Sequence, residues 1–167
     1  LPQYLSFLFT QQLFSDITSI GCHTHLWNFN TKQYHAWVRQ EGILDKLAPI
    51  KKSDEVIAVN FPLVPQPLKV GIGLHDSSAA LVPYIHSFQI PYVLISTGTW
   101  SISLNPFNQS VLTDAELKQD CLCYISYTGN PIKASRLFAG NEHEQEIKKL
   151  AQQFNQPADY FKTVEFN

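Results

Sequence analysis

The chain has 167 residues, of which 44% are hydrophobic and 16% are charged, and its formal net charge at pH 7 is −2. This length and composition are typical of a globular chain with a buried core. The charge balance provides no basic stripe, and no apolar run reaches the roughly 18 residues of a membrane-spanning helix, so nucleic-acid and membrane binding are not expected.

The predicted elements of the first half alternate between helix and strand. In chain order they are a helix at 2–9, a strand at 22–28, a helix at 34–47, a short strand at 56–59, a strand at 70–74 and a helix after Asp76. The strand at 22–28 would place His23, His25 and Trp27 on one face, and Gly42 and Pro49 would interrupt and end the second helix.

The second half changes to consecutive hairpins followed by a helix. The predicted elements are strands at 92–95 and 100–104, a capped helical turn at 113–117, a hairpin of strands at 121–127 and 132–137, and a helix from Asn141. Asn141 and Glu144 fit a capping box, and Ile147, Leu150, Ala151 and Phe154 fit a buried stripe. The change near residues 87–91 predicts an α/β chain with parts of two domains, 1–88 and 89–167.

The cysteines and the start of the sequence indicate the expected cellular location of the protein. Cys121 and Cys123 stand two apart in a strand-like run, and three cysteines is an odd number, which favours reduced thiols over a disulfide framework. The apolar start lacks the basic region and cleavage site of a signal peptide. We therefore expect a cytoplasmic protein. Because the sequence has no methionine, we also expect it to be part of a longer protein.

Asp76 is the candidate catalytic residue. It follows a strand and precedes a helix, where an acid is often an N-cap that accepts backbone N–H bonds. The functional alternative is a general base at the carboxyl end of a strand, where α/β sheets place their ligands. His75 is a candidate substrate contact, although a structural histidine is the commoner case.

The turn Ser96-Thr97-Gly98-Thr99 also has two readings. It fits an ordinary hairpin, and it fits a phosphate cradle made of backbone N–H groups and hydroxyls. It is not a Walker loop, because no lysine follows at the required spacing.

Three further polar clusters favour structural explanations. Cys22, His23 and His25 offer zinc-ligand chemistry but lack a second cluster, so no metal site is predicted. The acids at 142 and 144 suit the first turn of a helix. Lys133 and Arg136 are expected to be solvated charges.

The motifs GIGLHDSSAAL at 71–81 and VLISTGTWSISLN at 93–105 resemble those of the FGGY carbohydrate kinases. The resemblance extends over nearly the whole chain, and HD-S-x-A with STGTWS resembles the rhamnulose and fuculose kinase branch more than the glycerol kinase branch. It implies an actin-like ATPase (ribonuclease H-like) fold with mixed sheets and flanking helices. Residues 1–88 would be the C-terminal part of the first, sugar-binding domain, and 89–167 the N-terminal part of the second, ATP-binding domain.

The resemblance also implies an activity, its ligands and its site residues. The activity is transfer of the γ-phosphate of ATP, with Mg²⁺, to a hydroxyl of a ketose or related sugar. Asp76 matches the family's catalytic base, and Thr97, Gly98 and Thr99 match a phosphate loop. A homodimer is an expected assembly.

Two departures from the family limit these expectations. The family's amino-terminal hairpin, with its Mg²⁺ acid and another phosphate loop, and its adenine-binding Gly-rich part have no counterpart here. The chain therefore resembles the middle of such a kinase and is expected to be inactive alone. The alternatives are a kinase-derived binding or interaction module and, disfavoured by the HD-S-x-A motif, a chaperone-type actin-like ATPase.

Overall fold

The computed structural model describes residues 1–22 and 24–165. The helices within them are α1 (Pro2–Thr10), α2 (Ile17–Ile20), α3 (Ala36–Gln40), α4 (Asp76–Ser87), α5 (Asp114–Lys118) and α6 (Ala139–Gln153), with 3-10 turns η1 (Leu44–Lys46) and η2 (Tyr160–Thr163). The strands are β1 (Ser15–Asp16), β2 (Trp27–Asn28), β3 (Gln33–Tyr34), β4 (Ile50–Lys51), β5 (Val56–Val59), β6 (Leu68–Gly71), β7 (Leu94–Ser96), β8 (Ser101–Asn105), β9 (Cys121–Ile125) and β10 (Pro131–Leu137). Of the helices in this described part, none is long and apolar enough to cross a membrane.

The largest sheet is antiparallel and comes wholly from the second half of the chain. Its strand order is β7-β8-β10-β9, so the two hairpins predicted from the sequence join through β8 and β10. Smaller pairs form in the first half, where β1 and β4 are parallel while β2–β3 and β5–β6 are antiparallel. The chain is therefore α/β with mixed sheets and helices.

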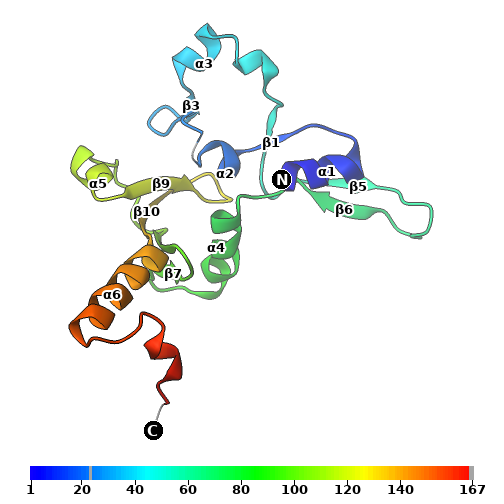
Figure 1. Cartoon of the computed structure of the whole chain (residues 1–167). Helices are drawn as coiled ribbons and strands as arrows, with labels where there is room; N and C mark the ends of the chain where they lie inside the picture. The colour runs from blue at the N-terminus through cyan, green and yellow to red at the C-terminus, as the bar shows by residue number, and fades with distance from the viewer. Residues whose placement is uncertain (23, 166–167) are drawn as a thin grey trace.

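The hydrophobic core lies between α4 and the four-stranded sheet. Its buried members are Cys22, Leu81, Leu104, Tyr124, Ile132 and Ala134. Ser78 on the first turn of α4 is also buried, and its hydroxyl donates a 2.8 Å hydrogen bond to the carbonyl oxygen of Ile125 on β9. Figure 1 shows α4 lying beside β9 and β10. Contacts from α4 therefore tie residues 76–87 to the sheet of the second half.

Several predicted elements are confirmed, and they are the ones with strong local signals. Pro2 opens α1, the amphipathic helix after Asp76 is α4, and β5 has the predicted bounds. At α5 the Thr113 hydroxyl accepts from the Glu116 N–H while Glu116 binds back to the Thr113 N–H, which is the predicted capping box.

The predicted strand at 22–28 is wrong, since among its described residues, 22 and 24–28, only Trp27 and Asn28 form a strand. Thr24 donates its hydroxyl to the carbonyl of Ile20, and His25 has a φ of 58°, in the left-handed region. Both features belong to a turn, and a turn gives no alternating faces. His25 and Trp27 therefore do not share a strand face, and the predicted position of His23 on that face lies outside the described residues.

Two helix predictions also need correction. The helix at 34–47 is reduced to α3 and η1, because Gly42 between them has a φ of 63°. The helix predicted from Asn141 begins at Ala139 after Phe138, without a side-chain cap, so its proposed capping box is absent from the described contacts. Its apolar stripe is not buried either, as Leu150 is 51% and Phe154 is 66% exposed.

Candidate functional site

Asp76 lies where the β6 strand has ended and α4 begins. The strand ends at Gly71, earlier than the predicted Leu74, and residues 72–75 connect it to the helix. His75 is the N-cap residue and Asp76 is the first helical residue, with its side chain 92% exposed. The Asp76 Oδ1 accepts from the N–H of Ser77 at 2.6 Å. His75 and not Asp76 therefore occupies the N-cap position, so the structure does not show the N-cap alternative for Asp76, and the Asp76 carboxylate faces solvent.

His75 connects the Asp76 carboxylate to the buried core. Its Nε2 lies 3.3 Å from Asp76 Oδ1 and 3.3 Å from the Sγ of Cys22. The ring centroids of His75 and Tyr124 are 5.8 Å apart. Burial, and to a smaller extent the charge of Asp76, raises the pKa of the Cys22 thiol to about 12. The thiol is therefore neutral at pH 7.

The connection between β6 and α4 is held by the first helix. Gly73 has a φ of 93°, and a Cβ placed there would stand 2.7 Å from the Cβ of Pro2 and 2.9 Å from its backbone carbon. The Gln3 side-chain amide donates to the Gly73 carbonyl at 3.4 Å. This close approach requires glycine and fixes the backbone just before His75.

The turn of Thr97, Gly98 and Thr99 joins β7 to β8 and is exposed. The Thr99 carbonyl accepts from the N–H of Gly140 at 2.9 Å, which places the turn at the first residues of α6. Exposed hydroxyls next to a helix N-terminus suit an anion such as a phosphate group. These features fit the predicted phosphate cradle, which stays a prediction.

Trp100, immediately after this turn, is held by aromatic and cationic contacts. Its ring stacks on Phe138 with centroids 4.6 Å apart, and the Arg136 guanidinium lies 5.4 Å from the Trp100 ring centre. Arg136 also pairs with Asp120 at 2.9 Å, and Lys133 pairs with Glu116 at 2.6 Å. The prediction that Lys133 and Arg136 are merely solvated charges is therefore wrong.

The two predicted site segments, residues 75–76 and the turn at 97–99, are held by different parts of the chain. Asp76 and His75 depend on residues 2–22 and β9, whereas the turn at 97–99 depends on α6.

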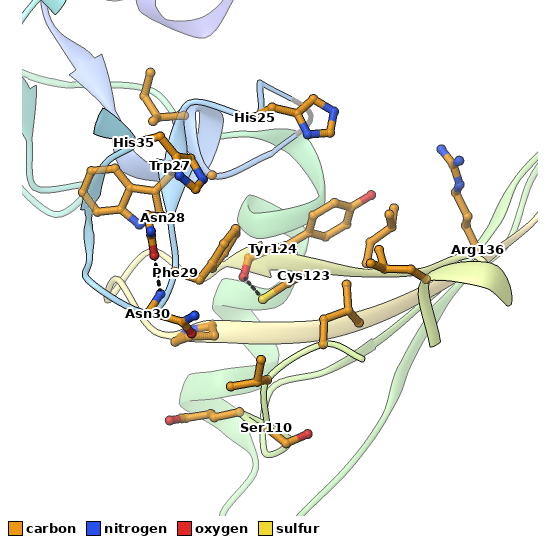
Figure 2. A pocket seen from close by; sticks show the side chains of 18 residues that line it. His25, Trp27, Asn28, Phe29, Asn30, His35, Ser110, Cys123, Tyr124 and Arg136 are labelled. Carbon is orange, nitrogen blue, oxygen red and sulfur yellow. Dashed lines mark hydrogen bonds between the residues drawn. The ribbon is translucent and has the colours of Figure 1, made fainter. Parts of the chain in front are cut away.

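A cavity of about 740 Å³ lies between the segment at 20–35 and the second half of the chain. Figure 2 shows the side chains of the 25–35 segment above the strand that carries Cys123 and Tyr124, and Ser110 below it. The residues that line the cavity include His25, Trp27, Phe29, His35 and Arg136. The described lining contains none of the site residues predicted from the sequence. The sequence indicated neither this cavity nor the buried Asp16 described below.

No metal centre is evident within residues 1–22 and 24–165, where no three His, Cys, Asp or Glu side chains gather closely enough to hold an ion. Cys22, Cys121 and Cys123 are free thiols.

Comparisons with known proteins agree with this architecture. Residues 89–165 match the family model described as carbohydrate kinase FGGY, C-terminal domain. No match was found among curated proteins. A solved carbohydrate kinase from Novosphingobium aromaticivorans is 29% identical, with a TM-score of 0.74, over 87% of this chain and 34% of that one.

Two more distant structures share the fold. A ligand-bound xylulose kinase from Lactobacillus acidophilus is 15% identical, with a TM-score of 0.65, over 96% of this chain and 33% of its own length. Glycerol kinase from Plasmodium falciparum with ADP is 18% identical, with a TM-score of 0.60, over 88% of this chain and 31% of its own length. The chain thus spans about a third of the length of each of these three structures.

These comparisons confirm the predicted fold class, the actin-like α/β fold of the FGGY carbohydrate kinases. The comparisons thus show that residues 89–165 are similar to the C-terminal domain of FGGY carbohydrate kinases and that the chain is similar to a solved carbohydrate kinase. They do not distinguish the rhamnulose and fuculose kinase branch from others.

Proposed function

We propose that the protein carrying this chain is an ATP-dependent sugar kinase. It transfers the γ-phosphate of ATP to a hydroxyl of a ketose or related sugar, and it belongs to the rhamnulose and fuculose kinase branch indicated by HD-S-x-A and STGTWS. The observation that carries the proposal is the exposed carboxylate of Asp76 at the first residue of α4. The carbohydrate kinase that is 29% identical over 87% of the chain supports the same reaction class.

In the proposed mechanism, Asp76 is the general base. Its carboxylate accepts the proton of the sugar hydroxyl as that oxygen attacks the γ-phosphorus, and ADP departs with the electrons of the broken P–O bond. The exposure of Asp76 allows a sugar to reach it, and His75, whose Nε2 is 3.3 Å from that carboxylate, is the proposed second contact for the sugar. Phosphoryl transfer depends chiefly on positioning and charge stabilisation, which a fixed carboxylate can supply.

Thr97, Gly98 and Thr99 are the proposed contacts for the phosphates of ATP. The exposed turn offers hydroxyls and backbone N–H groups, and the N-terminus of α6 adds a favourable field for negative charge. Within residues 1–22 and 24–165 no three His, Cys, Asp or Glu side chains gather closely enough to hold an ion by themselves. In kinases Mg²⁺ is commonly bound through the phosphates of the substrate.

The proposal includes a division of the chain. Residues 1–88 belong to the sugar-binding domain and residues 89–167 to the ATP-binding domain, so that the base and the phosphate turn come from different domains. The four-stranded sheet, which uses only residues 94–137, supports a separate second unit. A cytoplasmic location and a homodimer stay predictions.

Substrate screening tests this function against the alternative of a non-enzymatic binding module. Release of ADP would be followed with a panel of ketoses and ketose-free controls, using the protein that carries this chain. Isothermal titration of the chain with ATP–Mg²⁺ and the same ketoses would accompany it. A kinase gives ADP release that depends on a particular ketose. Absence of both ketose-dependent ADP release and heat of binding would reject the kinase in favour of the module.

A further inference from the structure

We infer that Asp16 and Thr18 are positioning residues for Asp76, a role that rests on the proposed function of Asp76 as the base. They lie about 60 residues earlier in the chain, at the start of α2, and neither touches the Asp76 side chain in the contacts described. They act instead through the backbone of His75.

Both residues are buried, although both are polar. Asp16 is 1% exposed and Thr18 is 0% exposed. A buried carboxylate is costly unless hydrogen bonds satisfy it. Asp16 caps α2, where its Oδ2 accepts from the N–H of Ser19 at 2.9 Å, and its Oδ1 accepts from the hydroxyl of Ser53 at 2.7 Å.

The Thr18 hydroxyl forms a directed link from this carboxylate to His75. It donates to Asp16 Oδ2. Its oxygen is therefore left to accept, and the backbone N–H of His75 donates to it at 2.9 Å. The hydrogen bond to Asp16 orients the Thr18 hydroxyl, and the oriented hydroxyl holds the backbone N–H of His75.

That position controls the start of α4. His75 is the N-cap residue and Asp76 follows it directly, so fixing the His75 N–H fixes the backbone that carries the base. Asp76 itself is 92% exposed and is restrained at its side chain by its immediate neighbours His75 and Ser77. Its placement therefore depends on the backbone. A displacement of about 1 Å can cost about 10²-fold in rate.

Replacing the Thr18 hydroxyl tests this role with two readouts. Thr18→Val substitutes a methyl group for the hydroxyl, Thr18→Ser keeps the hydroxyl, and Ser53→Ala removes a donor to Asp16 without touching the link to His75. Amide hydrogen exchange at His75 would be measured in the chain, and kcat and KM in the protein that carries it.

We expect Thr18→Val to lose protection of the His75 amide and to lower kcat by about 10–100-fold, with KM for ATP changed by less than about twofold. Thr18→Ser should restore both, and Ser53→Ala should affect both far less. Undiminished kcat or retained His75 protection in Thr18→Val would overturn the inference.

The hydrogen-exchange result at His75 does not depend on whether the protein has kinase activity. A His75 amide that exchanges as an unprotected amide in the unmodified chain overturns the inference even if Thr18→Val does not fold. If the unmodified protein shows no ketose-dependent activity while His75 is protected through Thr18, the proposed function fails and the structural link does not.

Discussion

His75 joins two groups of opposite character, an exposed carboxylate and a buried thiol. Its Nε2 is 3.3 Å from both Asp76 Oδ1 and Cys22 Sγ. Cys22 is only 4% exposed, and its pKa is raised to about 12 by burial first and by the negative charge of Asp76 second. The chemistry of Cys22 therefore reports on the surroundings of the proposed base.

The raised pKa predicts slow alkylation of Cys22. The thiolate is the reactive form, so at pH 8 a thiol with a pKa near 12 should react about 10³-fold more slowly than one near 9. Mass spectrometry after timed alkylation would measure Cys22 against the partly exposed Cys121 in the same chain. Asp76→Asn should speed the reaction of Cys22 modestly, because removing a nearby negative charge lowers the pKa of the thiol. Equal rates at Cys22 and Cys121 would contradict this account.

The same shift fixes the sign of a pH effect on stability. The folded state disfavours the Cys22 thiolate. The protonated thiol therefore stabilises the folded state fully at a pH below the unfolded-state pKa of about 9, and this stabilisation is lost as the pH rises toward the folded-state pKa of about 12.

At the scale of elements, the connection between β6 and α4 is the part on which the site depends most. Pro2 and Gln3 of α1 hold it at Gly73, and Thr18 of α2 holds it at His75. Two short helices from the start of the chain thus support the entry to α4.

Gly73→Ala should destabilise the protein, whereas Gly71→Ala should be tolerated. A side chain at Gly73 would meet the backbone of Pro2 and would occupy a φ of 93°, which together should cost about 1–3 kcal/mol or more. Gly71 has no atom within 4 Å of the same added carbon. Urea unfolding of both variants measures the difference in the free energy of unfolding. Equal stabilities would show that the approach of Pro2 is not a real constraint.

Local signals decided which elements could be predicted. The capping box at Thr113 and the amphipathic period after Asp76 act within a few residues, and both are confirmed. The start of α6 was missed because it depends on distant contacts, namely the stacking of Trp100 on Phe138 and the bond from Gly140 to Thr99. A single sequence does not display such contacts.

The same reason applies to the candidate site. Asp76 and the 97–99 turn could be proposed from the sequence because they stand in recognisable motifs, and their roles stay predictions. Asp16 and Thr18 were missed, since an acid followed by β-branched residues gives no sign of being buried. The N-cap pattern Asp16 to Ser19 was the one available signal.

At the scale of the whole molecule, the core joins the two halves of the chain. Cys22 and Leu81 pack with Leu104 and Ile132, and the hydroxyl of Ser78 binds β9. In the proposed kinase these contacts lie at the junction of the sugar-binding and ATP-binding domains. They connect the segment that carries the base to the sheet whose β7–β8 turn carries the phosphate contacts.

The central claim, that Asp76 is the base of a sugar kinase, is tested most directly by Asp76→Asn in the protein that carries this chain. The matched control is Asp114→Asn, which makes the same change at the exposed first residue of α5. We predict that Asp76→Asn lowers kcat for ketose phosphorylation by roughly 10²–10⁴-fold and changes the Kd for ATP by less than about twofold, while Asp114→Asn leaves both unchanged. Full turnover in Asp76→Asn would contradict the claim.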